Sequence, residues 1–242
     1  MNRRPFIGLI AGLIAVVALP VTALAGGEVT NGSFEEGDFT GGAFGFETLV
    51  AGSPTASAMT GWTVTEGSVD WIGNLWTAAD GAMSLDMNGT PSNGVGVVGA
   101  ITQTVATTVS NTYVVQFWLA GNPDCGPGTK TLIVSATGAA PASYAFENTG
   151  STTRADMGWQ PMAYSFVATL DSTTLTFAAD PNSTSFCGPA LDGVTSTETA
   201  LTGAHCKQGG WLTMHDADGA PFKNQGDCVS FYATGGATPI EN

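Results

Sequence analysis

Apolar and polar residues alternate along most of the chain between residues 61 and 194. Such alternation is typical of antiparallel strands with one face buried and the other exposed. Clusters of Gly, Asn, Asp and Pro separate the runs, and no segment of 12 residues has a convincing helical period. The pattern predicts an all-β fold, an antiparallel β-sandwich of the jelly-roll type. The clearest runs place apolar residues at Tyr113, Val115, Phe117 and Leu119, at Leu132, Val134 and Ala136, at Tyr164, Phe166 and Ala168, and at Leu175, Phe177 and Ala179.

Two short segments bracket this region, residues 31–37 (NGSFEEG) and residues 187–194 (CGPALDGV). We predict that they form the first and last strands of one sandwich, with Phe34 and Leu191 pointing inward. Glu35 and Asp192 then lie at a shared edge. Residues 38–60 are rich in Gly, Ala, Ser and Thr, which favours a long loop.

The first 25 residues are predicted to be a signal peptide. Arg3 and Arg4 precede an apolar run, and a small-x-small cleavage signal follows at residues 23–25. An uncleaved membrane anchor is the alternative. We expect export, with the sandwich over residues 26–196, a threonine-rich linker over residues 197–203, and a small Cys-bridged module with a tail over residues 204–242.

The charge balance bears on the partner. Six Lys and Arg residues, two of them in the predicted leader, stand against 20 Asp and Glu residues, so the mature chain carries a net charge of about −16. Such a surface repels phosphate backbones and anionic lipids, which argues against nucleic acid and membrane surfaces as partners. Neutral polymers and cations remain suitable partners.

The four cysteines all lie beyond the predicted leader. An even number of cysteines in an exported chain indicates disulfides, and four of them allow three pairings. We favour Cys125 with Cys187 and Cys206 with Cys228, because each pair then stays within one compositional block. The spacing lacks a CxxC motif, which argues against a zinc site.

A series of ordered motifs carries a family resemblance: NGSFE at 31–35, GWTV at 61–64, GSVDWIG at 67–73, DG at 80–81, SLDMNG at 84–89, LAGNPDC at 119–125 and CGPALDGV at 187–194. In this order they resemble the bacterial choice-of-anchor C proteins, relatives of the plant cell-wall proteins called domain of unknown function 642. The resemblance implies a galactose-binding-like jelly roll, export, and residence at a cell wall or cell surface. Residues 206–231 resemble a small Cys-bridged module of actinobacterial exported proteins.

Aromatic residues next to Asp and Asn are the first candidates for binding. An exposed indole offers a platform for the apolar face of a sugar ring, while nearby carboxylates and amides bind its hydroxyl groups. Trp118 alternates with Tyr113 and Phe117, so it is expected to face outward. For each tryptophan, packing in the core is the alternative. The predicted carbohydrate-binding residues are Asp70, Trp71, Asn74, Trp76, Asp80 and Trp118.

Glu35 and Asp192 are the candidate metal ligands. The resemblance to calcium-bearing sugar-binding sandwiches suggests a structural Ca²⁺ between the first and last strands, bound by hard oxygen ligands. The alternative for Glu35 is a solvated carboxylate at the edge of an acidic protein. No other cofactor is expected.

Catalysis finds little support in the residues. Hydrolysis of a glycoside needs two carboxyl groups across a cleft, and nothing singles out one pair among the 20 acidic residues. The chain has no GxSxG motif. The sequence therefore predicts a secreted, non-catalytic protein that binds cell-wall polysaccharide. The alternatives are an adhesive matrix protein that acts through protein contacts and, less favoured, a polysaccharide hydrolase or lyase.

Overall fold

The computed structural model describes residues 27–90, 98–183, 185–199, 202–203, 206–207, 209–212 and 221–233. The predicted signal peptide over residues 1–25 lies outside these residues, as do both histidines, His205 and His215. Within the described parts of the chain, no helix is both long and apolar enough to cross a membrane.

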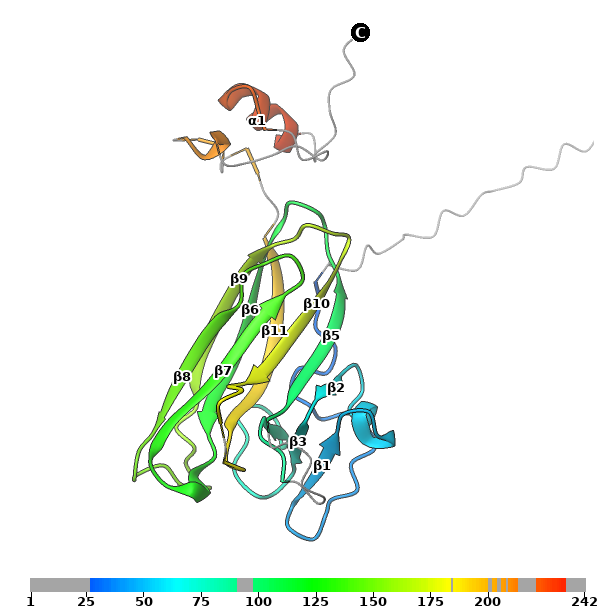
Figure 1. The fold of residues 1–242 in the computed structure, drawn as a ribbon. Helices are drawn as coiled ribbons and strands as arrows, with labels where there is room; N and C mark the ends of the chain where they lie inside the picture. Colours follow the sequence, from blue (N-terminus) through cyan, green and yellow to red (C-terminus); the bar gives the residue numbers. More distant parts are fainter. Residues whose placement is uncertain are drawn as a thin grey trace, which may run out of the picture.

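Two antiparallel sheets form the body of the protein (Figure 1). The alternating strands predicted from the sequence are all present, and the all-β sandwich is confirmed. The six-stranded sheet has the order β1 (Phe46–Val50), β3 (Ser68–Ile72), β4 (Ser84–Asp86), β11 (Pro189–Thr199), β6 (Thr112–Gly121) and β9 (Gln160–Val167). The five-stranded sheet has the order β2 (Thr63–Glu66), β5 (Ala100–Ala106), β10 (Ser172–Ala179), β7 (Gly128–Ala136) and β8 (Ala142–Asn148).

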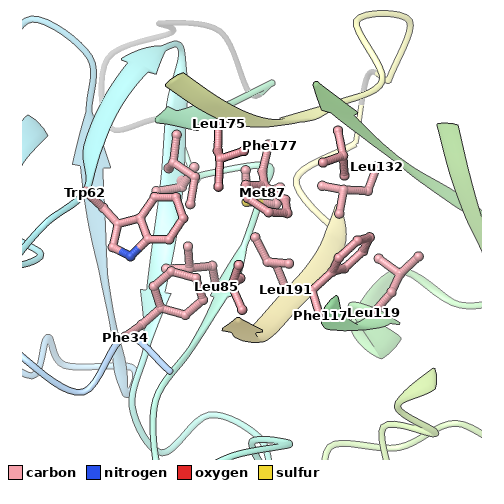
Figure 2. Close-up of a cluster of buried hydrophobic side chains, with 14 of the residues drawn as sticks. Phe34, Trp62, Leu85, Met87, Phe117, Leu119, Leu132, Leu175, Phe177 and Leu191 are labelled. Carbon is pink, nitrogen blue, oxygen red and sulfur yellow. The ribbon is translucent and has the colours of Figure 1, made fainter. Parts of the chain in front are cut away.

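The hydrophobic core lies between the two sheets, where their inward side chains meet (Figure 2). Phe34 and Leu191 both have no exposed surface, so their predicted inward orientation is confirmed. Trp62 packs between the ring of Phe34 and the ring of Phe177, with centroid distances of 5.6 and 5.9 Å. Its indole N–H donates to the carbonyl of Asn31, which ties the beginning of the sandwich to its core.

The two segments at the N-terminal side differ from the prediction. Residues 31–37 form turns instead of a first strand, because Asn31 and Phe34 both have positive φ angles that interrupt an extended backbone. The predicted long loop over residues 38–60 contains strand β1 and a short 3-10 helix, η1 (Pro54–Ser57). Strand β1 forms because it pairs with β3, a partner that local composition does not reveal.

Both predicted disulfides are confirmed, Cys125–Cys187 and Cys206–Cys228. The first joins η2 (Pro123–Cys125), which follows β6, to the segment that precedes β11. The second lies in a separate hydrophobic cluster formed with Phe222 and Phe231. This cluster contains η3 (Gly210–Leu212) and a nine-residue helix, α1 (Gln225–Ala233), which the sequence analysis did not predict.

Candidate functional site

Glu35 and Asp192 hold one loop, residues 79–83, from two sides. Asp192 Oδ2 accepts hydrogen bonds from the backbone N–H groups of Ala79 and Asp80, at 2.7 and 2.9 Å. Glu35 Oε1 accepts from the N–H groups of Ala82 and Met83, both at 2.7 Å. The two carboxylates therefore fix the loop that follows Trp76 although they lie far apart in the sequence.

These hydrogen bonds affect whether the carboxylates of Glu35 and Asp192 can bind a calcium ion. Calcium takes six to eight oxygen ligands. Asp192 Oδ1 accepts the N–H of Gly193 at 2.6 Å, so both of its oxygens face backbone donors. Those donors carry partial positive charge, which opposes a cation at the same oxygens. Among the described residues, no group of three or more His, Cys, Asp and Glu side chains could hold a metal ion. The arrangement suits a loop clasp better than a metal site.

Trp118 is the exposed aromatic side chain next to this loop. It lies on β6, where inward and outward residues alternate, and 37% of its surface is exposed. The predicted outward orientation is confirmed. Its indole N–H has no hydrogen-bond partner among the described residues, whereas the indole N–H groups of Trp62, Trp71, Trp76 and Trp159 all have one. Trp118 therefore presents both an apolar ring and a free donor.

Gly193 brings Trp118 and Asp80 together. The register between β11 and β6 shifts after the Asp192–Trp118 pair, and Gly193 adopts a φ of +55° at this bulge. A Cβ atom at Gly193 would lie 2.7 Å from Cδ1 of Trp118 and 3.6 Å from Cβ of Asp80. Only glycine lets the indole lie so close to the backbone. The exposed residue Asp80 and the Trp118 side chain thus both lie against Gly193.

The neighbouring strand and loop extend this face. Pro161 of β9 pairs with Trp118 and is exposed, and Gln160 next to it is exposed as well. The indole N–H of Trp159 donates to the carbonyl of Thr77 at 3.0 Å, which joins the loop after β3 to the start of β9. The sequence pattern did not indicate these residues. The one available signal was the Gly158-Trp159 pair at the start of an alternating run.

Trp71 and Trp76 do not form the exposed platform that was predicted for them. Trp71 has no exposed surface and Trp76 is 5% exposed. The indole of Trp71 donates to the carbonyl of Phe34 and meets the ring of Phe39 edge-on at 5.1 Å. Trp71 pairs with Leu85 of β4 and therefore shares its inward face, where the segment around Phe34 and Phe39 packs against the indole. The alternative, packing in the core, is what the structure shows.

Asp70 and Asn74 lie apart from Trp118. Asp70 is buried, where it accepts hydrogen bonds from the hydroxyl of Thr48 and from the N–H and hydroxyl of Thr90. Its burial raises the pKa of the carboxyl, and these hydrogen bonds offset part of the rise. Asn74 is exposed in a turn whose N–H groups donate to Gly45. Of the six predicted residues, the structure therefore brings together two, Asp80 and Trp118.

Asp192 is the titratable group with the unusual environment at this site. Burial raises its pKa to about 7, three backbone N–H donors offset part of that rise, and the negative charge of Asp80 adds to it. The side chain has no exposed surface. It can therefore hold the loop in place but cannot reach a bound molecule.

Comparison with known proteins assigns the sequence to a family. Residues 27–196 match the family model described as "Protein of unknown function (DUF642)". The chain belongs to the DUF642 family. Among individual relatives, this DUF642 protein is 27% identical over 213 residues to halomucin of Haloquadratum walsbyi. That match covers 82% of the chain but only 2% of the length of halomucin.

Several solved carbohydrate-binding modules have similar structures to this DUF642 protein. TmCBM61, solved in complex with β-1,4-galactotriose, is 18% identical with a TM-score of 0.38, and the match covers 70% of this chain and 96% of the module. The CBM35 from Cellvibrio japonicus Abf62 is 16% identical with a TM-score of 0.40, over 63% of this chain and 92% of the module. A family 35 module from Clostridium thermocellum is 18% identical with a TM-score of 0.38, over 64% and 98%.

Proposed function

We propose that the protein is exported and binds polysaccharide, without cleaving it, on the face formed by Trp118 and Asp80. The observation that carries this proposal is the exposed indole of Trp118, which lies on a strand and against Gly193 with its N–H free. The ring suits the apolar C–H face of a sugar, and the Asp80 carboxylate beside it suits the sugar hydroxyl groups. Because a strand and a clasped loop hold both groups, little order is lost on binding.

The environment of the carboxylates supports a role without catalysis. A raised pKa is one mark of a catalytic acid, and Asp192 has one. However, Asp192 has no exposed surface and both of its oxygens accept backbone N–H groups. Asp192 therefore cannot serve as the second carboxyl that glycoside hydrolysis would need beside Asp80.

Other features support export, which is part of this proposal together with residence at a cell surface. Two disulfides suit an oxidising compartment. The strongly acidic composition argues against nucleic acid and anionic membranes as partners at this face. A structural calcium ion at Glu35 and Asp192 stays a subsidiary proposal. Native mass spectrometry before and after chelation tests it, and an unchanged mass refutes it.

Retention of the mature chain on insoluble glycans tests the binding proposal. The panel contains cellulose, chitin, peptidoglycan and β-1,4-galactan, with the bound fraction measured against protein concentration. We expect saturable retention on at least one glycan and at least a tenfold loss for Trp118→Ala. Gln116→Ala is the matched control, because Gln116 is the next outward residue on the same strand and is also exposed. Its retention should equal that of the wild type.

Three results would contradict the proposal. Equal retention of Trp118→Ala and wild type would show that this face does not bind the glycan. Self-association without retention on any glycan would favour the adhesive matrix protein. Release of soluble sugar that one acidic substitution abolishes would instead establish an enzyme.

A further inference from the structure

A polar pocket of about 250 Å³ lies at another part of the sandwich, between the start of β7 and the segment that joins β10 to β11. Neither Trp118 nor Asp80 lines it. Pockets for drug-sized ligands measure about 300–1,000 Å³, so this one suits about one sugar ring. Most of the residues that line it are polar: Thr129, Lys130, Thr131, Asp180, Asn182, Ser183, Ser185, Gly188 and Pro189.

Lys130 is the positively charged residue that lines this pocket. Its side chain is partly buried, and its Nζ donates to the carbonyl of Cys187 at 2.7 Å. Burial lowers the pKa of the ammonium, and the negative charge of the buried Asp86 offsets part of that change. No carboxylate of the described residues forms an ion pair with Lys130, whereas Arg154 is paired with Asp124 at 2.7 Å. Lys130 therefore keeps N–H donors for a ligand.

Two serine hydroxyls add further donors. Ser183 Oγ accepts the side-chain N–H of Asn88 at 2.7 Å, and Ser185 Oγ accepts the backbone N–H of Cys187 at 3.1 Å. Each oxygen thus already has its donor from the protein, and neither hydroxyl proton has an acceptor among the described residues. Together with Lys130, these protons favour a ligand group rich in acceptors.

Asp180 is the acidic residue that lines the pocket, and it accepts hydrogen bonds within the turn that it begins. Its Oδ1 accepts the backbone and side-chain N–H groups of Asn182, both at 2.9 Å. These two donors offset part of its charge, so Asp180 opposes an anion in the pocket less than a free carboxylate would. The overall negative charge of the protein opposes an anion weakly as well, since salt at 0.15 M screens charges beyond about 8 Å.

The wall of the pocket is held rigidly. Cys187 is joined to Cys125, and the N–H of Gly188 donates to Asp86 Oδ1 at 2.9 Å. A Cβ atom at Gly188 would lie 2.6 Å from that oxygen. Glycine therefore allows the loop to close on the sheet, which holds the donors in place before a ligand arrives.

We propose that this pocket binds the anionic group of an acidic sugar, a carboxylate or a sulfate ester, with the ammonium of Lys130 opposite the charge. Ser183 and Ser185 donate to the same group. This site is separate from the Trp118 face. The inference rests on the proposed function: the polysaccharide bound at the Trp118 face also carries an acidic residue or a charged substituent, which the pocket binds. Charge-assisted hydrogen bonds of this kind are about twice as strong as neutral ones.

Isothermal titration of the full mature chain tests the proposal with D-glucuronate, D-glucose 6-sulfate, D-glucose and sodium sulfate. We expect saturable binding of glucuronate or glucose 6-sulfate, at least tenfold tighter than binding of glucose, and the tighter of the two identifies the group. Lys130→Gln should weaken that binding at least tenfold, because glutamine keeps a donor for Cys187 but loses the charge. Asp180→Asn should leave the affinity unchanged or increase it. Gln116→Ala, which lies outside both sites, should not change it, and repeating the titrations with Trp118→Ala separates binding at the Trp118 face from binding in the pocket.

Several outcomes would overturn the proposal. If glucose binds as tightly as glucuronate and glucose 6-sulfate, the anionic group of the sugar does not contribute to binding. If Lys130→Gln binds with unchanged affinity, the ammonium of Lys130 does not contribute either. Sodium sulfate that binds as tightly as either sugar would refute the assignment to a sugar. If Lys130→Gln does not fold, Ser183→Ala and Ser185→Ala carry the test, and wild-type affinity in both would contradict the donor assignment.

Discussion

The bridge between Cys125 and Cys187 should contribute strongly to the stability of the sandwich. The two residues are 62 apart in sequence, and the bridge closes the chain between β6 and β11. In the chain-entropy treatment, a loop of this length stabilises the folded state by about 4 kcal/mol, because the bridge restricts the unfolded chain. The double variant Cys125→Ala/Cys187→Ala should therefore lose about that much free energy of unfolding.

Urea unfolding followed by tryptophan fluorescence measures this loss. The matched control is Cys206→Ala/Cys228→Ala, whose bridge spans 22 residues in a separate hydrophobic cluster. This control should leave the transition of the sandwich within about 0.5 kcal/mol of wild type, since its cluster shares no residue with the main core. A loss below about 1 kcal/mol in the first variant, or an equal shift in the control, would refute the reasoning.

Three further predictions concern single residues. Trp71→Ala should lower the free energy of unfolding by about 3–5 kcal/mol because its indole is fully buried. Trp118→Ala should change it by less than about 1 kcal/mol because its indole is partly exposed. Equal losses for the two variants in urea unfolding would contradict the buried position of Trp71 and the exposed position of Trp118. Gly193→Ala should reduce glycan retention at least tenfold, because the added methyl group displaces the Trp118 indole, and wild-type retention would argue against a role for that contact. The free energy of unfolding should fall as the pH rises from about 4 to 8. Burial raises the native pKa of Asp86 from 3.8 to about 8, so the folded protein holds a proton that the unfolded chain has released. Asp86→Asn should flatten this slope in urea titrations across that range, with Asp192 contributing what remains, and an unchanged slope would count against the assignment.

Sequence periodicity predicted the strands that have one buried face and one exposed face. In β6 the inward Phe117 and the outward Trp118 follow directly from alternation, because one face packs on the second sheet and the other meets solvent. The same rule fails at Asp70 in β3, which is buried although it lies on the face opposite Trp71. Thr48 and Thr90 come from elsewhere in the chain and cover it, and no local pattern indicates that cover.

The candidate sites depend even more on contacts between distant segments. Asp80 reaches Trp118 through the bulge at Gly193, and a register shift of this kind leaves no periodic signal. Likewise, the pocket donors come from Lys130 on β7 and from the serines near Cys187, which the disulfide brings together. The sequence shows that these residues exist, but their meeting depends on tertiary structure.

The contacts of Glu35 and Asp192 with the loop over residues 79–83 determine when the proposed binding face can form during synthesis of the chain. The loop over residues 79–83 depends on Glu35, 47 positions before Ala82, and on Asp192, 113 positions after Ala79. A nascent chain that ends before β11 has Trp118, Asp80 and Glu35 but lacks Asp192 and Gly193. The proposed glycan face is therefore completed by β11, the last strand among the described residues, and a chain that has not reached β11 has no assembled site with which to bind polysaccharide.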